Sequence, residues 1–352
     1  MHKEQHPNEP WQLTQTTKLA GFEFREGEDR TTLGIWAWNR VFIIQQNDGK
    51  KVAVSLIDSQ GTFDNHTTYQ DCSTIFAMTC MFSSVMCFNV FTDLQEDKLN
   101  DLATFVDHAK KIVDNLGGNG KLFQDLAFIV RDCCFNKYLE DKNGGQKYIE
   151  KVLSEVKVQE RQEVRDSLNA SYERKFGFVF PHPGKQVALK KTSKISEMDS
   201  EFVEKTKEMV ETLLSPAKLS IKQLGPVEFC CKDMCSYIPL CVQCFDENQE
   251  FAPQAVQTVN RDFVINKEVQ RAIEKYIEFL EKVFVNCKTG YDQIKMDEFH
   301  MNAFTCVQND ILKRIKSKAI NDEIMKIFVK QANNKYVHYF EKNQLLVEVR
   351  HF

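Results

Sequence analysis

Two strand-like segments end in aspartate residues that have the chemistry of a nucleotide site. The alternating apolar run at 51–57 leads into Asp58-Ser59-Gln60-Gly61. Nucleotide hydrolases place a carboxylate at such a strand end to steer magnesium, and a glycine that follows it senses the γ-phosphate. A cap on an ordinary loop is the structural alternative for Asp58.

The second segment reads LAFIVRDCCF and places Asp132 just after a buried strand. A carboxylate there can accept two hydrogen bonds, from the N1–H and the exocyclic amine of guanine, and adenine cannot supply that pair. A local ion pair between Arg131 and Asp132 is the alternative. A third loop, FPHPGKQVA, follows the strand expected at 176–180. Because the carboxyl ends of parallel strands meet at one edge of a sheet, the three loops are expected to share a crevice.

The elements that position these loops follow from hydrophobic spacing. Alternation predicts a hairpin of strands 35–45 and 51–57 joined by the turn NDGK. Helices are expected at 70–82, 94–115, 145–172 and 199–214, and further strands at 85–91, 123–131 and 176–180. This order predicts an α/β fold with a mainly parallel sheet. From about residue 250 the apolar residues recur every three or four positions, which predicts a helical bundle.

Bulk properties exclude several classes of protein. The 352 residues carry a formal charge of −4, which gives no broad cationic field for nucleic acid. The polar start MHKEQHPNEP is not a secretory leader, so the 12 cysteines are expected to be reduced thiols in the cytoplasm. An uncharged run at 72–92 meets the length test for a membrane span, but it divides into a helical part and a β-branched part. No membrane span is therefore expected.

Seven short motifs, in this order and at nearly matching spacing, resemble the atlastins, which are dynamin-superfamily GTPases of the endoplasmic reticulum related to guanylate-binding proteins. The motifs are GIW at 34–36, the hairpin at 48–64, QED at 95–97, VRD at 130–132, GG at 144–145, PHPG at 181–184 and LLSP at 213–216. The resemblance runs from about residue 21 to about 345. It implies a Ras-like G domain followed by a three-helix bundle. The expected division is an irregular N-terminus at 1–20, a truncated G domain at 21–225, a connecting helix at 226–250 and the bundle at 251–352.

The resemblance also implies roles for individual residues, with GTP or GDP and Mg²⁺ as cofactors. Nucleotide contacts fall on Asp58, Gln60, Gly61, Arg131, Asp132 and Val187, with Arg131 and Asp132 as the guanine-reading pair and Val187 in the loop that caps the base. Asp58 is expected to be a weak, water-mediated magnesium ligand.

The first switch reads Arg30-Thr31-Thr32-Leu33-Gly34, whereas the family has Arg-x-Thr-Thr-Gly. Holding Arg30 and Gly34 in register puts Leu33, which has no oxygen to offer, where the magnesium-binding threonine belongs. Thr32 can replace that threonine only if the backbone shifts by one residue.

The phosphate-binding motif G-x-x-x-x-G-K-[ST] does not occur in the sequence. Its backbone N–H groups and lysine hold the β- and γ-phosphates, and the family's catalytic arginine lies in the same loop. We therefore expect no intact catalytic residue, weak nucleotide binding and impaired hydrolysis, and the sequence leaves open whether this chain is an enzyme. In the family a central strand lies directly before this motif, and this sequence has no segment that matches it. The two strands that would flank it therefore each keep a row of backbone groups that needs another partner.

Three functions remain open. The first is an atlastin-class GTPase for endoplasmic reticulum fusion and tubule organisation that lacks an N-terminal segment. The second is a pseudo-GTPase at the cytosolic face of that membrane, which binds a second copy or an intact atlastin through its G domain. The third is a zinc-dependent interaction module built on the cysteine cluster at 230–244. Core packing is the alternative for that cluster, with Cys231, Cys235, Ile238, Cys241 or Val242, and Phe245 on one helical face.

Overall fold

A computed structural model describes residues 21–22, 31–61, 68–113, 121, 123–189, 194–248, 253–285, 287 and 289–349. The chain divides into two compact units. One contains the strands of the expected G domain and the helices around them, up to residue 248 of the described part. The other contains residues 224–228 and the described helices from residue 253 onward.

The chain first forms a β-hairpin. Strand β1 (Ile35–Gln45) pairs antiparallel with β2 (Lys51–Ser59), in the register that brings Ile44 opposite Val52. The turn closes through a hydrogen bond of 2.8 Å from the Gln46 N–H to the Lys50 carbonyl, and Gly49 takes the left-handed conformation with φ 88°. The predicted hairpin is therefore confirmed, with β2 two residues longer than expected.

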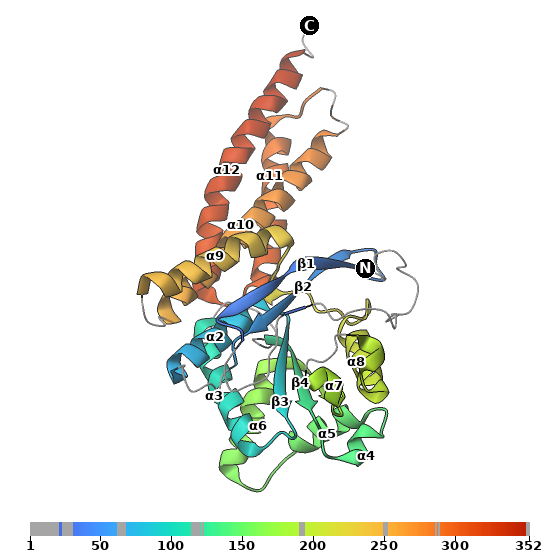
Figure 1. The fold of residues 1–352 in the computed structure, drawn as a ribbon. Coiled ribbons are helices and arrows are strands. Elements are labelled where there is room, and N and C mark those ends of the chain that lie inside the picture. Colours follow the sequence, from blue (N-terminus) through green and yellow to red (C-terminus); the bar gives the residue numbers. More distant parts are fainter. Residues whose placement is uncertain are drawn as a thin grey trace. The chain divides into compact units, whose positions relative to one another are not determined.

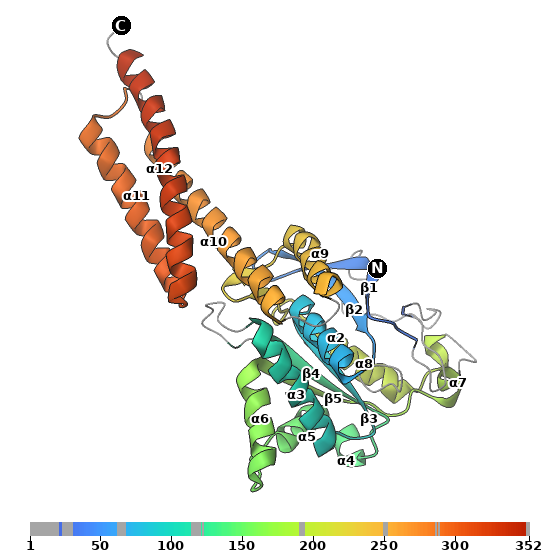
Figure 2. The same cartoon turned by 90° about the vertical axis from the view of Figure 1, so that its left-hand side faces the viewer.

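Three parallel strands, β3 (Val85–Phe91), β4 (Phe123–Arg131) and β5 (Tyr172–Val179), form the second sheet in the order β3-β4-β5 (Figure 2). Their connections contain α3 (Glu96–Val113), α4 (Asn136–Leu139), α5 (Gly144–Val152) and α6 (Gln159–Ser171). The predicted bounds of β3 and β4 are correct. Strand β5 begins four residues before the prediction because it follows α6 without an intervening loop.

The two sheets are not joined by a hydrogen-bonded ladder in the part of the chain that the structure describes. Strand β2 pairs there with β1 alone, and β3 with β4 alone. The sequence predicted two rows of backbone groups in need of other partners, and pairing of these two edges with each other would have satisfied both rows. In the described residues they do not pair, so each edge keeps a row of backbone groups directed away from its own sheet.

The remaining elements of this unit are mostly helical: α2 (Tyr69–Phe82), α7 (Lys185–Ala188), a 3₁₀ helix (Ile195–Glu197), α8 (Ser200–Leu213), the short strands β6 (Gln223–Leu224) and β7 (Val227–Glu228), of which β7 belongs to the other unit, and α9 (Cys231–Asn248). Thr68 and Asp199 cap α2 and α8 by accepting backbone N–H bonds in the first turn. The uncharged run at 72–92 divides between α2 and β3 as predicted. No described helix is both long and apolar enough to cross a membrane.

A glycine pair brings α5 directly onto β5. A Cβ atom built on Gly177 would lie 2.3 Å from the Gly145 carbonyl oxygen, and one on Gly145 would lie 2.4 Å from the Gly177 carbonyl oxygen. Only glycine permits this approach of two backbones, and it is the physical reason for the GG motif at 144–145. On α8, Phe202 and Met209 pack against the buried cluster of Ala127, Phe178 and Phe180.

A buried ion pair fixes the amino ends of β4 and β5. The Asp125 carboxylate is 3% exposed and accepts hydrogen bonds of 2.8 and 2.6 Å from the Arg174 guanidinium and one of 2.7 Å from the Ser220 hydroxyl. These bonds satisfy the carboxylate away from water, as a buried charge requires. The two strands are thereby held together at the end opposite the predicted site.

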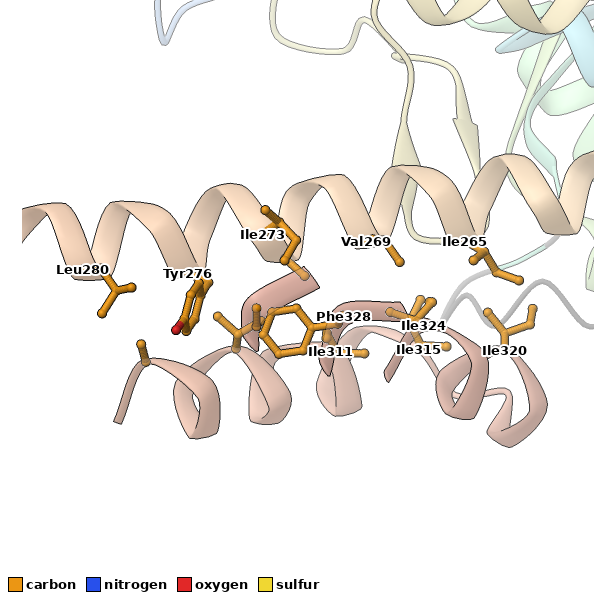
Figure 3. Close-up of a cluster of buried hydrophobic side chains, with 14 of the residues drawn as sticks. Ile265, Val269, Ile273, Tyr276, Leu280, Ile311, Ile315, Ile320, Ile324 and Phe328 are labelled. Atoms are coloured by element: carbon orange, nitrogen blue, oxygen red, sulfur yellow. The ribbon is translucent and has the colours of Figure 1, made fainter. Parts of the chain in front are cut away.

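The helical unit consists of α10 (Pro253–Phe284), α11 (Gln293–Arg314) and α12 (Lys318–Val349). Figure 3 shows the apolar side chains of α10 directed toward those of the other two helices, among them Tyr276 and Phe328. Glu268 of α10 is 1% exposed and accepts hydrogen bonds from Arg271 and Arg314. The predicted helical bundle is confirmed.

Substitution of Gly177 by alanine should destabilise the protein, because the new Cβ collides with backbone rather than with a movable side chain. We expect a loss of about 1–3 kcal/mol in the free energy of unfolding, measured by urea denaturation. Gly61→Ala is the control, since nothing lies within 4 Å of a Cβ at that position. Equal stability of both variants would show that α5 and β5 do not approach closely.

Candidate functional site

The first group of predicted site residues lies at the open end of the hairpin. The Gln60 N–H donates to the Gly34 carbonyl at 2.8 Å, and the Gly34 N–H donates to Gln60 Oε1 at 3.1 Å. Gly34 has φ 70°, a conformation that favours glycine. These bonds continue the ladder beyond β1 and β2, so Gln60, which is 6% exposed, holds the first switch against the strand end.

Within this group the hydroxyl of Thr32 donates a hydrogen bond to the Asp58 carboxylate. Leu33 turns its side chain to solvent, 58% exposed, while its carbonyl accepts a bond of 2.9 Å from the Trp36 indole. The side chain beside Asp58 is therefore that of Thr32. A carboxylate and a hydroxyl supply the oxygen ligands that magnesium prefers, so the two residues fit such an ion.

Gly61 and Arg30 are the two other residues predicted for this end of the hairpin. Gly61 is described and exposed, next to Gln60. Arg30 lies outside the described residues.

The second group lies at the carboxyl end of β4, where Asp132 adopts a left-handed backbone with φ 51°. Hydrogen bonds hold it from both sides. The Arg131 carbonyl accepts the Thr92 N–H at 2.7 Å, and the Cys133 N–H donates to the Phe180 carbonyl at 2.9 Å. Thr92, at the end of β3, also has a positive φ of 63°. Strained backbone of this kind costs about 1–3 kcal/mol per residue and tends to collect at functional sites.

The Asp132 side chain has an oxygen that nothing in the described structure satisfies. Its Oδ1 atom is buried and has no hydrogen-bond partner there. Leaving such an acceptor unpaired costs about 1–3 kcal/mol, and more for a charged group. A ligand with adjacent N–H donors would remove that cost, so the residue fits the guanine base that the sequence predicted.

Arg131, the other member of the predicted pair, points elsewhere. Its Nε donates to Asn89 Oδ1 at 2.8 Å, and its guanidinium lies 5.8 Å from the centre of the Phe91 ring. Both partners belong to β3. The structure therefore separates the Arg131 and Asp132 side chains, and the alternative of a local ion pair between them is wrong.

Val187 lies in the loop that follows β5. It is 5% exposed within α7, which begins after Gly184 in a left-handed conformation with φ 106°. The same connection starts at Phe180, whose carbonyl holds Cys133. The loop predicted to cap the base and the residue predicted to read it therefore arise from neighbouring strand ends.

The structure thus gathers the predicted residues into two groups, one on each sheet. Thr92 and Phe180 belong to the second group although the sequence did not single them out. Both act through backbone atoms, and the only available signal was their position at the ends of predicted strands, with Thr92 directly after one and Phe180 the last residue of another.

The cysteine cluster on α9 forms only part of the predicted apolar face. Asp233, Tyr237 and Cys241 are buried, whereas Cys231 and Cys235 are exposed. The prediction is correct for Cys241 and wrong for Cys231 and Cys235. The buried Asp233 carboxylate accepts the Cys230 N–H at 2.9 Å at the start of the helix. The side chain of Phe245 lies outside the described residues.

The zinc alternative gains no support from this geometry. No group of three or more metal-ligating side chains comes together in the described residues. Burial raises the pKa of the Cys241 thiol to about 12 and so opposes formation of the thiolate that zinc needs.

Comparison with known proteins gives a consistent result. The family model described as "Guanylate-binding protein, N-terminal domain" matches residues 12–223. Atlastin-1 of Bos taurus is 32% identical over 78% of this chain and 50% of its own length, and atlastin-3 of Mus musculus is 30% identical over 86% and 57%. Atlastin-3 of Homo sapiens is 36% identical over 62% of this chain and 41% of its own length. The chain spans about half the length of the curated relatives it matches.

Asp132→Asn should stabilise the ligand-free protein. Asparagine tolerates the left-handed conformation and replaces a charged oxygen without a partner by a neutral amide. We expect a gain of about 1 kcal/mol in the free energy of unfolding, measured by urea denaturation, with exposed Asp322→Asn unchanged as the control. A loss of stability in Asp132→Asn would mean that Oδ1 has a protein partner.

Proposed function

This chain belongs to the guanylate-binding protein family, as an atlastin-type large GTPase, and from that premise we propose that its G domain recognises guanine through Asp132. The observation that carries the proposal is the buried Oδ1 atom of Asp132, which has no partner in the described structure. Guanine presents its N1–H and its exocyclic amine side by side, and a carboxylate accepts both.

The backbone around Asp132 supports this role. The bonds from Thr92 and to Phe180 hold the backbone on both sides of Asp132 before any ligand arrives, so little backbone ordering remains to be done on binding. Val187 and its loop would cover the base from the neighbouring strand end. Arg131 would stay hydrogen-bonded to Asn89 of β3 instead of forming a second hydrogen bond to the base.

The hairpin group would serve the phosphate side of the nucleotide. Asp58 and Thr32 would hold Mg²⁺, directly or through water, and Gln60 would fix the switch through Gly34. A bound magnesium ion neutralises the charge on the phosphates. In this proposal the hydroxyl of Thr32 supplies the magnesium-binding oxygen that the side chain of Leu33 lacks.

We further propose that the 352 residues bind guanine nucleotides weakly and hydrolyse GTP slowly. The motif that cradles the phosphates is not among them, and transition-state contacts of the kind it carries contribute about 10³- to 10⁵-fold in rate. The resemblance to atlastins supports a place at the cytosolic face of the endoplasmic reticulum, in membrane fusion or tubule organisation.

Base selectivity tests the role of Asp132. In Asp132→Asn the amide donates a hydrogen bond where the carboxylate accepted one, so preference should shift from guanine toward xanthine, which carries an oxygen in place of the amine. We expect the ratio of GTP to XTP affinity to fall by about 10- to 100-fold. Competition against a fluorescent GTP analogue in the presence of Mg²⁺ measures it. Asp322→Asn should keep the original ratio, and an unchanged ratio in Asp132→Asn would contradict the proposal.

The role of Thr32 is tested by a pair of substitutions. Thr32→Val keeps the shape and removes the hydroxyl, so the Mg²⁺-dependent part of nucleotide affinity should fall by about tenfold. Leu33→Thr adds a hydroxyl at the exposed position and should change nothing. Titration of the fluorescent analogue with and without Mg²⁺ separates the two. A gain in Mg²⁺-dependent affinity in Leu33→Thr, with no loss in Thr32→Val, would contradict this role of Thr32. It would favour the register that puts residue 33 at the magnesium-binding position.

A further inference from the structure

Tyr148 of α5 lies where the connections that follow β3 and β4 meet. Figure 1 shows both strands pointing toward the same end of the sheet, where α4 and α5 lie. Tyr148 is 7% exposed. Its hydroxyl accepts a hydrogen bond of 3.0 Å from the Leu94 N–H, after β3, and its ring centre lies 5.7 Å from that of Phe135, after β4. One side chain therefore contacts both connections.

The connection after β3 begins with a strained turn at Thr92. The Asp93 N–H donates to the Phe91 carbonyl at 2.8 Å, and Thr92 between them has φ 63°. This is the pattern of a γ-turn with a positive φ, which is rare and strained. The strain is greater for threonine because its side chain branches at Cβ. Such a conformation persists only where neighbouring groups hold it.

Two side chains hold the chain just beyond this turn. Tyr148 binds the N–H of Leu94, two residues after Thr92. The Glu96 carboxylate accepts hydrogen bonds of 2.6 and 3.1 Å from the buried guanidinium of Arg165. The bond to Tyr148 is the nearer of the two to the turn along the chain, and it is made to the backbone. Tyr148 therefore restrains the backbone beside the turn directly.

The turn at Thr92 also holds the residue that is proposed to read guanine. The Thr92 N–H donates to the Arg131 carbonyl at 2.7 Å, and that carbonyl belongs to the peptide that leads into Asp132. The hydroxyl of Tyr148 is therefore linked to the backbone of Asp132 through two hydrogen bonds and the short segment between them.

Packing is incomplete on one side of these contacts. An open cavity of about 480 Å³ lies beside Leu94, Phe135 and Tyr148. Close packing resists displacement, and a cavity removes that resistance. The segment after Thr92 is therefore free to shift if its bond to Tyr148 is lost. Water can reach the freed N–H from the cavity, so the protein should stay folded without that bond.

We propose that Tyr148 is a positioning residue for guanine recognition. Its hydroxyl holds the turn at Thr92, and the turn fixes the peptide that orients the Asp132 carboxylate. Contact with the base belongs to Asp132, so this role of Tyr148 rests on the proposed function of that residue. The sequence did not single out Tyr148, because only the fold brings α5 to the end of β3.

The expected signature is a loss of base selectivity beyond any loss of affinity. Guanine offers two donors to one carboxylate, and both bonds are strong in only one orientation, because hydrogen bonds weaken steeply as they depart from linear geometry. Hypoxanthine, the base of ITP, lacks the exocyclic amine and offers one donor. A carboxylate that is free to tilt therefore loses more with GTP than with ITP. A tyrosine that only stabilised the fold would affect both nucleotides alike.

Tyr148→Phe removes the hydroxyl and keeps the ring. We expect the ratio of GTP to ITP affinity to fall by about threefold or more, the worth of a weakened hydrogen bond, measured by competition against a fluorescent GTP analogue. Tyr138→Phe is the matched control. The Tyr138 ring centre lies 5.1 Å from that of Tyr148, and its hydroxyl bonds to no residue in the described part of the chain. This variant should keep the original ratio.

Hydrogen exchange on the ligand-free protein gives a second readout, which does not depend on nucleotide. In Tyr148→Phe the amides of Thr92 and Leu94 should exchange faster by about threefold or more, because the segment that contains them has lost an anchor. The amide of Ala127, in the middle of β4, should be unchanged, which verifies that the sheet is intact. Tyr138→Phe should match the unaltered protein at all three amides.

Equal affinity of the unaltered chain for GTP and ITP would contradict the role of Asp132, and with it that of Tyr148. Where the unaltered chain distinguishes the two nucleotides, either of two results would overturn the role of Tyr148 alone: an unchanged ratio in Tyr148→Phe, or an equal fall in Tyr138→Phe. Unchanged exchange at Thr92 and Leu94 in Tyr148→Phe would also overturn it, because the hydroxyl would then not hold the turn.

Discussion

In the proposed function, the conformation of one peptide segment, at the end of β4, determines what the G domain can recognise. Asp132 would leave its left-handed conformation if the chain were free, because that conformation is strained for a residue with a side chain. Strands on both sides prevent this, β3 through Thr92 and the continuation of β5 through Phe180. This restraint on Asp132 depends on the strand order β3-β4-β5. That order makes β4 the central strand, whose end can be held from both sides.

That constraint depends in turn on close packing elsewhere in the unit. The contact between Gly145 and Gly177 sets the distance of α5 from β5, and the Asp125 carboxylate fixes the other end of the same strands through Arg174. Both are interactions of backbone or of a fully satisfied charge, and neither tolerates much displacement. Recognition at one end of the sheet thus rests on rigidity along its whole length.

Hydrophobic spacing predicted the strands of the sheet, the bundle and Asp132 at a strand end, because burial dictates spacing directly. It did not predict the direction of Arg131, which follows from an amide on the neighbouring strand, Asn89. The exposure of Cys231 and Cys235 on α9 was not predicted either, because the buried position between them belongs to a polar residue, Asp233, whose carboxylate accepts the Cys230 N–H. Sequence patterns report the period of an element, and they do not report the polar contacts that a single side chain makes.

The hairpin shows the same division. Its strands and turn were predicted from the sequence, whereas the hydrogen bond from Thr32 to Asp58 was not. That bond depends on the contact of Gly34 with Gln60, which brings the residues before β1 next to the end of β2. In the described residues the hairpin is also a sheet of its own with two open edges, which the spacing of apolar residues could not disclose.

The central claim is that the Asp132 carboxylate reads two adjacent donors on guanine. Comparing the affinities of the unaltered chain for GTP, ITP, XTP and ATP tests it most directly, because inosine keeps the N1–H and lacks the amine. The account predicts that ITP binds about tenfold more weakly than GTP, with XTP and ATP weaker still. Equal affinity for all four nucleotides would contradict it.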